Sequence, residues 1–182
     1  MERRQQILAA AAELFAARGF HGVSVHDVGA ACGISGPALY RHFASKDAML
    51  GEMLVGISER LLDEARARLR EAAGPRAALD ALLDWHIDFA LSHRSLIVVQ
   101  DRDWESLPDD ARVRVRRLQR AYIDLWIDQL VQVEPRLERD EAAARVRAVF
   151  GLLNSTPRSR RLPDPQLRPL LASMGWAALR AA

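Results

Sequence analysis

The fold of this chain is decided by residues 29–46, which read GAACGISGPALYRHFASK. The stretch combines the end of one helix, a tight turn at Gly33 and a short helix that starts after Ser35. Leu39 and Phe43 are four residues apart, so they share the inward face of the short helix and leave its other face to solvent. A short helix held against another by a glycine-containing turn predicts a helix-turn-helix, the arrangement that enters the major groove of DNA.

The residues before this stretch predict two more helices. Apolar residues recur every three or four positions in the first helix, and Gly19 marks its end. Ser24 is a suitable N-cap for the second helix, and Asp27 three residues later completes a near capping box. The apolar face of the first helix comprises Ile7, Leu8, Ala11, Leu14 and Phe15.

Together these segments resemble the TetR family of dimeric bacterial transcription factors, over residues 5–54. The similarity is carried by ILAAAAELFAARGF at residues 7–20, SVHDV at 24–28, LYRHF at 39–43 and SKD at 45–47. It implies an all-α fold, with an N-terminal three-helix helix-turn-helix domain at residues 1–46. A helical-bundle domain for ligand binding and dimerisation would follow at residues 47–182. A general likeness to regulators of fatty-acid or steroid catabolism accompanies this resemblance.

Nine residues are predicted to contact DNA, most of them around the third helix. Tyr40, His42 and Lys46 are placed to donate hydrogen bonds to phosphates, which fix the register without reading sequence. Ser24 and Ser35, at helix N-termini, add hydroxyl contacts to phosphate. Lys46 is the only lysine among 26 basic residues. The full set is Ser24, Ser35, Gly36, Pro37, Ala38, Tyr40, Arg41, His42 and Lys46.

Base reading is expected from the first residues of the third helix. Gly36 and Ala38 are small enough to let the helix lie close to base edges, and Pro37 offers an apolar contact to a thymine methyl group. All three are poor hydrogen-bond donors. We therefore expect much of the sequence specificity to come from Arg41 or from the shape of the DNA.

The remaining sequence predicts longer helices and no strand, because it lacks sustained alternation and Asn-Gly turns. The pair Gly74-Pro75 separates two of these helices. Residues 93–103 read as a connector or a short helix, and residues 154–165 as irregular. The expected helices span residues 46–70, 75–92, 109–133, 138–153 and 165–179.

Bulky aromatic residues with polar tips concentrate on the middle helices and predict an effector site. Such side chains can line an elongated, mostly apolar cavity with a few hydrogen-bonding groups. Aromatic residues at helical spacing are also ordinary core residues, and that alternative stays open for each of them. The candidate effector-binding residues are Trp85, His86, Phe89, Trp104, Arg116, Tyr122, Trp126, Phe150 and Asn154.

An arginine stripe bears on the chemistry of the effector. Arg112, Arg116 and Arg120 lie four residues apart, on one face of the predicted helix. The stripe suits either a solvated helix face or the anionic head of an acyl-coenzyme A. The sequence alone leaves both interpretations open.

The last two predicted helices carry apolar stripes that favour a homodimer. Paired with a second copy they would form a four-helix bundle, as the family resemblance also implies. Two-fold symmetry would place two reading helices about 34–36 Å apart, which matches a palindromic operator in double-stranded DNA. The residues expected on this surface are Val146, Val149, Phe150, Leu153, Leu167, Leu170, Leu171, Met174 and Leu179.

Composition fits a globular protein of a reducing compartment. The net charge is only +2, so any positive potential must be local to one region. Cys32 is the only cysteine and has no His/Cys cluster around it, so neither a disulfide nor a metal site is expected. The chain has no signal-peptide pattern and no apolar run of about 18 residues. We expect a cytoplasmic protein with no membrane partner and no cofactor.

These observations favour a ligand-responsive repressor, released from its operator by a small hydrophobic or acyl-coenzyme A-like effector. One alternative is a regulator of drug efflux that answers to neutral hydrophobic compounds. An enzyme using His86 with Asp84 or Asp88 is disfavoured, because the chain lacks a nucleophile elbow, a phosphate-binding glycine loop and a Glu-x-x-His metal pair.

Overall fold

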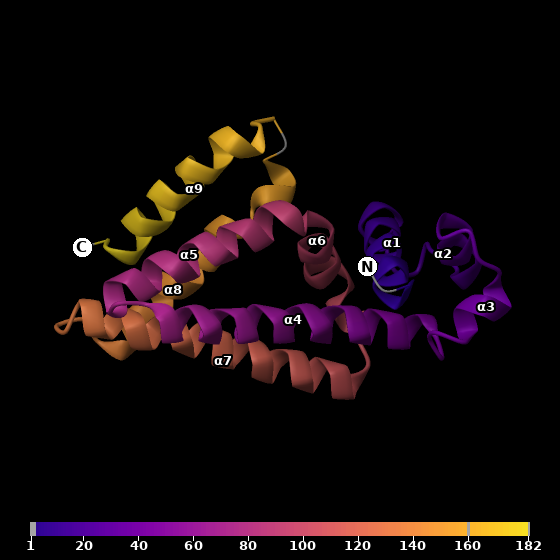
Figure 1. Ribbon diagram of the computed structural model, residues 1–182, viewed down its shortest axis with the longest axis horizontal. Coiled ribbons are helices and arrows are strands. Elements are labelled where there is room, and N and C mark those ends of the chain that lie inside the picture. Colours follow the sequence, from indigo (N-terminus) through magenta and orange to yellow (C-terminus); the bar gives the residue numbers. More distant parts are fainter. Residues whose placement is uncertain (1–2, 160, 182) are drawn as a thin grey trace. The chain divides into compact units, whose positions relative to one another are not determined.

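The computed structural model describes residues 3–159 and 161–181, and within these ranges all regular structure is helical (Figure 1). This confirms the predicted all-α fold. The α-helices are α1 (Arg3–Arg18), α2 (Val25–Ala31), α3 (Gly36–Tyr40), α4 (Lys46–Glu71), α5 (Pro75–Ser92), α6 (Arg94–Asp103), α7 (Asp109–Val133), α8 (Arg139–Leu153) and α9 (Asp164–Leu179). Two short 3-10 helices, η1 (Trp104–Ser106) and η2 (Thr156–Arg158), lie between them.

Local sequence signals account for the first three helices. The predicted capping box is present: the Asp27 amide donates to Ser24 Oγ at 3.1 Å, and the Ser24 amide donates to Asp27 Oδ2 at 2.7 Å. Gly33 has φ +65°, a conformation that glycine adopts without strain, and it reverses the chain between α2 and α3. A Cβ on Gly29 would lie 2.8 Å from the Ile34 carbonyl oxygen, so α2 meets the turn at a distance that only glycine allows.

Contacts divide the chain into two compact units, and each is described by itself. The first unit takes in Met1–Ile57 and Ser95–Arg116, and the second takes in Ser58–Arg94 and Arg117–Ala182. The first unit thus groups α6, η1 and the start of α7 with the helix-turn-helix. The division into functional domains at residue 46 follows chain order instead, and it stays a prediction.

In the first unit, the helices pack around apolar side chains, which include residues of the predicted apolar face of the first helix. Ile7 and Phe15 of α1 are completely buried, as are Val28 of α2 and Leu50 of α4. Residues 93–103, left open between connector and helix, form α6 and the residue before it. This core holds α3 on the surface of the unit, with only Leu39 buried among its residues.

In the second unit, α5, α7, α8 and α9 pack together with the end of α4 around Trp126, which is fully buried. This packing corrects part of the predicted dimer surface. Six of its residues are buried in the core of their own chain: Val146, Val149, Leu153, Leu167, Leu171 and Leu179. Leu170 and Met174 of α9 stay exposed, at 47% and 44% of their surface. None of the described helices is both long enough and apolar enough to cross a lipid bilayer.

Candidate nucleic-acid interface and effector site

Helix α3 has one buried and one exposed face, as its sequence predicts. Leu39 and Phe43 are buried in the first unit, with about 1% and 2% of their surface exposed. Tyr40 is 56% exposed, which is unusual for so large a side chain. Pro37 and Arg41 are also exposed, while the predicted contacts Gly36, Ala38 and His42 are partly buried. The structure therefore leaves Tyr40 and Arg41 accessible to a partner.

Gly36 opens α3 with an ordinary backbone and free space around it. Its φ is not positive, and a Cβ placed there would meet nothing within 4 Å. Neither a positive φ nor contact with residues distant in the chain therefore explains a glycine at this position, although Gly36 directly precedes Pro37, whose ring disfavours a side chain on a preceding helical residue. Because Gly36 has no side chain, the backbone beside Pro37 can approach a partner closely.

The two predicted serine contacts serve first as helix caps. The Ser24 hydroxyl donates to Asp27 Oδ2 at 2.5 Å. The hydrogen bonds from the Ser24 side chain and backbone lower the pKa of Asp27. The Ser35 hydroxyl oxygen accepts from the Ala38 amide at 3.3 Å and keeps its own hydrogen for donation. Of the two hydroxyls, that of Ser35 is the more available to a phosphate.

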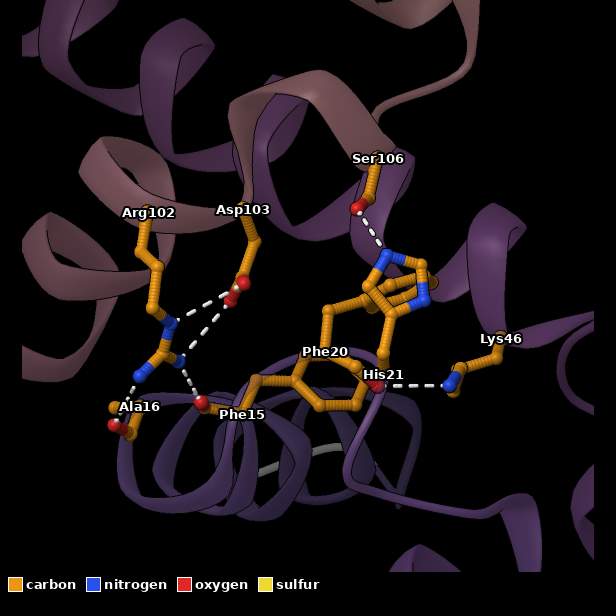
Figure 2. Close-up of polar contacts among 8 residues, drawn as sticks. All are labelled: Phe15, Ala16, Phe20, His21, Lys46, Arg102, Asp103 and Ser106. Carbon is orange, nitrogen blue, oxygen red and sulfur yellow. Dashed lines mark hydrogen bonds and ion pairs between the residues drawn. The ribbon is translucent and has the colours of Figure 1, made fainter.

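Lys46 lies at the start of α4, and its ammonium group binds backbone carbonyls of the α1–α2 loop. The Nζ atom donates to the Phe20 oxygen at 2.7 Å and to the Val23 oxygen at 2.8 Å (Figure 2 shows the first). The same atom lies 4.2 Å from the centre of the Phe20 ring. An ammonium has three N–H donors, so one stays available for phosphate. Sequence reasoning missed the carbonyl contacts because backbone acceptors have no signature in a sequence.

Six of the predicted effector-binding residues come together in the second unit. The His86 ring stacks on Phe150 with the ring centres 4.7 Å apart and the planes within 12°. Tyr122 also stacks on His86, at 5.8 Å. Phe89 and Trp126 meet His86 edge to face, at 5.5 and 6.2 Å. We call His86, Phe89, Tyr122, Trp126, Phe150 and Asn154 the aromatic cluster.

A hydrogen-bond chain fixes the tautomer of His86 at the centre of the aromatic cluster. His86 Nε2 lies 3.1 Å from Asn154 Oδ1, a carbonyl oxygen that can only accept, so Nε2 carries the hydrogen. His86 Nδ1 is then an acceptor, and the Tyr122 hydroxyl, 3.2 Å away, donates to it. Burial lowers the pKa of His86 to about 4, against a smaller opposing effect of Asn154. Burial also raises the pKa of Tyr122. Both rings are therefore uncharged at neutral pH.

Trp126 brings a further donor into the aromatic cluster. Among the described residues its Nε1 is one of four buried side-chain atoms that lack a hydrogen-bond partner. The indole N–H interacts with the Tyr122 hydroxyl and lowers the pKa of Tyr122, but it has no partner at full hydrogen-bond geometry. A buried donor without an acceptor costs about 1–3 kcal/mol. The aromatic cluster therefore holds one N–H group that a ligand could satisfy.

The other three candidate residues make other contacts. The Trp85 indole donates to the Leu61 oxygen at 3.3 Å, and the Arg68 guanidinium lies 4.5 Å from its ring centre, so Trp85 has a packing role in the second unit. Trp104 and Arg116 belong to the first unit, where the guanidinium lies 5.5 Å from the indole ring centre. Among the residues that the structure describes, no group of His, Cys, Asp and Glu side chains is arranged to hold a metal ion.

Two family descriptions match this chain. Residues 7–53 match "Bacterial regulatory proteins, tetR family", and residues 72–158 match "Tetracyclin repressor-like, C-terminal domain". The HTH-type transcriptional repressor KstR2 of Rhodococcus jostii is 31% identical over 129 residues, which cover 70% of this chain and 63% of that protein. The chain thus spans less than two thirds of the length of this relative.

Solved structures agree with these matches. The TetR family regulator PfmR of Thermus thermophilus aligns with a TM-score of 0.84 at 26% identity, and the alignment covers 100% of this chain and 98% of PfmR. A TetR-family regulator of Bordetella parapertussis aligns with a TM-score of 0.83 at 26% identity, covering 94% and 93% of the two chains. These findings confirm the family predicted from the helix-turn-helix residues and set aside the enzyme alternative. The chain belongs to the TetR family of transcriptional regulators.

Proposed function

We propose that this chain is a DNA-binding transcriptional repressor, and that a small effector releases it from a palindromic operator. The observation that carries the proposal is the two-faced helix α3. Leu39 and Phe43 anchor it in the first unit, while Tyr40 and Arg41 are exposed. A short helix held in this way can enter the major groove with its outer face toward the bases.

The proposed contacts fall into two groups. Tyr40, His42 and the remaining donor of Lys46 would bind phosphates, with Ser24 and Ser35 nearby. The first residues of α3 would face the bases, but their side chains have no hydrogen-bond donors. Arg41 and the shape of the DNA would therefore supply the sequence specificity. The base-facing residues in this proposal are Gly36, Pro37, Ala38 and Arg41.

Two copies are needed to read a palindrome, and α8 and α9 support a homodimer. Leu170 and Met174 form an exposed apolar pair on α9. On α8, Ala144, Ala148 and Gly151 are exposed and small, so a partner helix could approach closely. Two such faces related by a two-fold axis would form a four-helix bundle.

The proposed effector binds at the aromatic cluster. The central groups are uncharged, and the Trp126 Nε1–H lacks an acceptor. An apolar effector with one acceptor group would satisfy this donor, and side chains such as Phe150 would have to move to admit it. Effector binding can lower operator affinity only if it favours one of two states of the protein. Helix α4, unbroken from Lys46 to Glu71, contributes residues to both units and is the proposed route for this change.

Two effector classes follow from different parts of the sequence. The arginines of α7 favour an acyl-coenzyme A, whose phosphates they would bind. The uncharged aromatic cluster favours a neutral hydrophobic compound, as expected for a regulator of drug efflux, because a buried charge would have no partner there.

Binding and sedimentation experiments test the proposal. The chain is used to select fragments from its own genomic DNA, and the selected fragments are titrated by fluorescence anisotropy against bulk competitor DNA. We expect a palindromic fragment to be preferred, and a dimer in analytical ultracentrifugation. Palmitoyl-coenzyme A and a neutral ketone are then added in separate titrations, and one of them should weaken binding. No preference for any fragment, or sedimentation only as single subunits, would overturn the proposal.

A further inference from the structure

We infer that Arg102 of α6 is a positioning residue for DNA binding, which fixes the end of α1 and the α1–α2 loop without touching DNA. This inference rests on the proposed DNA-binding function. It concerns a residue outside the helix-turn-helix sequence, and one that none of the sequence patterns singled out. Its basis is a group of polar contacts within the first unit (Figure 2).

The Arg102 guanidinium bridges α6 and the last turn of α1. Its Nη1 donates to the Ala16 oxygen at 3.1 Å, and its Nη2 donates to the Phe15 oxygen. The carbonyls at the end of a helix carry partial negative charge, and that of Phe15 accepts from the Gly19 amide at 2.8 Å as well as from Arg102. A guanidinium is suited to this place because its planar fork holds several donors in fixed directions.

Asp103 holds the guanidinium in this orientation. Its carboxylate accepts from Arg102 Nε at 3.2 Å and from Nη2 at 3.1 Å, and Asp103 is itself buried. The guanidinium therefore has a charged partner on one side and the α1 carbonyls on the other. Its charge is neutralised within the protein, so Arg102 is not expected to release a counterion from DNA.

Two further side chains fix the loop that follows α1. The Ser106 hydroxyl of η1 lies 3.0 Å from His21 Nε2, and Lys46 of α4 donates to the carbonyls of Phe20 and Val23. Three separate segments thus bind the chain between Phe15 and Val23. The next residue is Ser24, the N-cap of α2.

The position of the α1–α2 loop determines the position of α3 through the packing of α2. Helix α2 begins at the end of the loop, and α2 contacts both α1 and α3. A loop that loses its attachment to α6 would allow α2 and α3 to take up several positions. Fixing them again on the operator would cost conformational entropy, which lowers affinity.

Substitution of Arg102 tests the inference on the full chain with its selected operator fragment. Arg102→Gln should lower operator affinity about tenfold, which is the size expected for the entropy of fixing about one freed backbone residue again on the operator. The slope of log affinity against log salt concentration should not change, because no phosphate contact is lost. Arg66→Gln removes the same charge from an exposed ion pair on α4 and is the matched control. It should leave both quantities unchanged.

Two results would overturn the inference. A salt slope that falls by about 0.9 shows that Arg102 binds a phosphate directly. Unchanged affinity per folded molecule shows that Arg102 only stabilises the fold. If Arg102→Gln does not fold, Asp103→Asn is used instead, with the same two predictions, because the guanidinium then loses its charged partner.

Hydrogen exchange separates this inference from the proposed function. The Gly19 amide donates to the Phe15 oxygen of α1 at 2.8 Å, and the Gly22 and Val23 amides donate to the Gly19 and Phe20 oxygens of the loop at 3.2 and 3.4 Å. In Arg102→Gln they should exchange faster while amides of the second unit are unchanged. If the wild type prefers no DNA fragment, the proposed function fails. Faster amide exchange in Arg102→Gln would still show that Arg102 fixes the α1–α2 loop. If exchange is unchanged, the inference fails whether or not the chain binds DNA.

Discussion

At the scale of single residues, Gly36 differs from the other glycines of the helix-turn-helix, because we propose a contact with DNA as a reason for it. Other glycines of the helix-turn-helix have structural reasons: Gly33 has a positive φ, and Gly29 has the Ile34 carbonyl within 2.8 Å of its missing Cβ. Gly36 has neither reason. A glycine in a helix is less stable than alanine by roughly 0.5–1 kcal/mol. Gly36 also precedes Pro37, whose ring crowds the Cβ of a preceding helical residue, so the proposed close approach to base edges is one of two physical accounts of this glycine.

Gly36→Ala should change the free energy of unfolding by no more than about 1 kcal/mol, because the smaller backbone entropy of alanine and the crowding of its Cβ by the Pro37 ring act in opposite directions. Operator affinity should fall, because a methyl group would stand between α3 and the base edges. Urea unfolding and anisotropy titrations measure the two effects. Gly33→Ala is the control and should lose stability, since its φ of +65° strains any residue with a side chain. Equal operator affinity of Gly36→Ala and wild type would contradict the close approach.

Lys46 has both a structural and a proposed DNA-binding role, and Lys46→Ala should reveal both. The Phe20 and Val23 carbonyls would lose their donor, which should lower the free energy of unfolding by about 1–3 kcal/mol. Loss of the phosphate contact should reduce the salt slope of operator binding by about one unit. A slope equal to that of wild type would mean that Lys46 acts only through the loop.

His86 should make stability depend on pH. Burial lowers its pKa to about 4 in the folded chain, and the unfolded value is about 6.5. Between these values the unfolded state binds more protons, so the free energy of unfolding rises with pH, by about 3 kcal/mol across the window. This contribution is complete above pH 6.5 and is lost as the pH falls toward 4. Burial and Arg60 lower the pKa of His93 too, so His93 acts in the same direction.

Urea unfolding of wild type and His86→Gln at pH 7.5 and pH 4.5 isolates this contribution. The free energy of unfolding should differ less between the two pH values in His86→Gln than in wild type, by most of the expected contribution of about 3 kcal/mol. Glutamine keeps a side chain that can both donate and accept but does not titrate. Parallel pH profiles would show that His86 is not the group responsible.

At the scale of elements, the sequence predicts helices well where the signal is local. The Ser24 cap, the Gly33 turn and the break at Gly74-Pro75 involve neighbouring residues, and all three are found at helix ends. Partners far apart in the chain are different. Nothing local to residues 94–103 shows that Arg102 would meet α1, and nothing local to Lys46 shows which carbonyls it would bind.

The apolar stripes of α8 and α9 show a second limit. A stripe indicates that a face is buried, without saying whether its own chain or a second copy covers it. Here Val146 and Leu171 are covered by their own unit, while Leu170 and Met174 are not. For the aromatic cluster, spacing predicted that His86 and Tyr122 would share a site. It did not predict that their rings would contact each other directly.

The double variant Leu170→Glu, Met174→Glu tests the dimer face of α9. Both side chains are nearly half exposed, so the isolated fold should tolerate the charges. Four like charges brought together in a two-fold interface would oppose association. Sedimentation should shift from dimer to monomer, and operator affinity should fall with it. Ala73→Glu, on an exposed residue between α4 and α5, is the control and should remain dimeric.

At the scale of the whole molecule, the proposed repressor has to connect an effector site in one unit with a reading helix in the other. Two long helices contribute residues to both units. One is α4, and the other is α7, which begins in the first unit and continues in the second. An effector that changes the preferred state of either helix would change operator affinity, typically 5–150-fold in coupled systems.

Trp126 offers a way to test this connection from the effector side. A neutral ketone such as 1-indanone can accept from the Trp126 Nε1–H, whereas the hydrocarbon indane has the same skeleton and no acceptor. The ketone should therefore bind more tightly, by about tenfold for one satisfied buried donor. It should weaken operator binding at concentrations where indane does not. Isothermal titration measures ligand affinity, and anisotropy measures operator affinity in the same samples.

The variant Trp126→Phe should abolish the difference between ketone and hydrocarbon, because both ligands then meet a ring without a donor. Trp176→Phe is the matched control: its indole already donates to Asp80 Oδ1 at 2.7 Å and lies outside the aromatic cluster, so the preference for the ketone should persist. Equal affinity of the two ligands for wild type would remove the aromatic cluster from the proposed effector site. A preference that survives in Trp126→Phe would assign the recognition to another donor, for which the Asn154 amide is a candidate in the aromatic cluster.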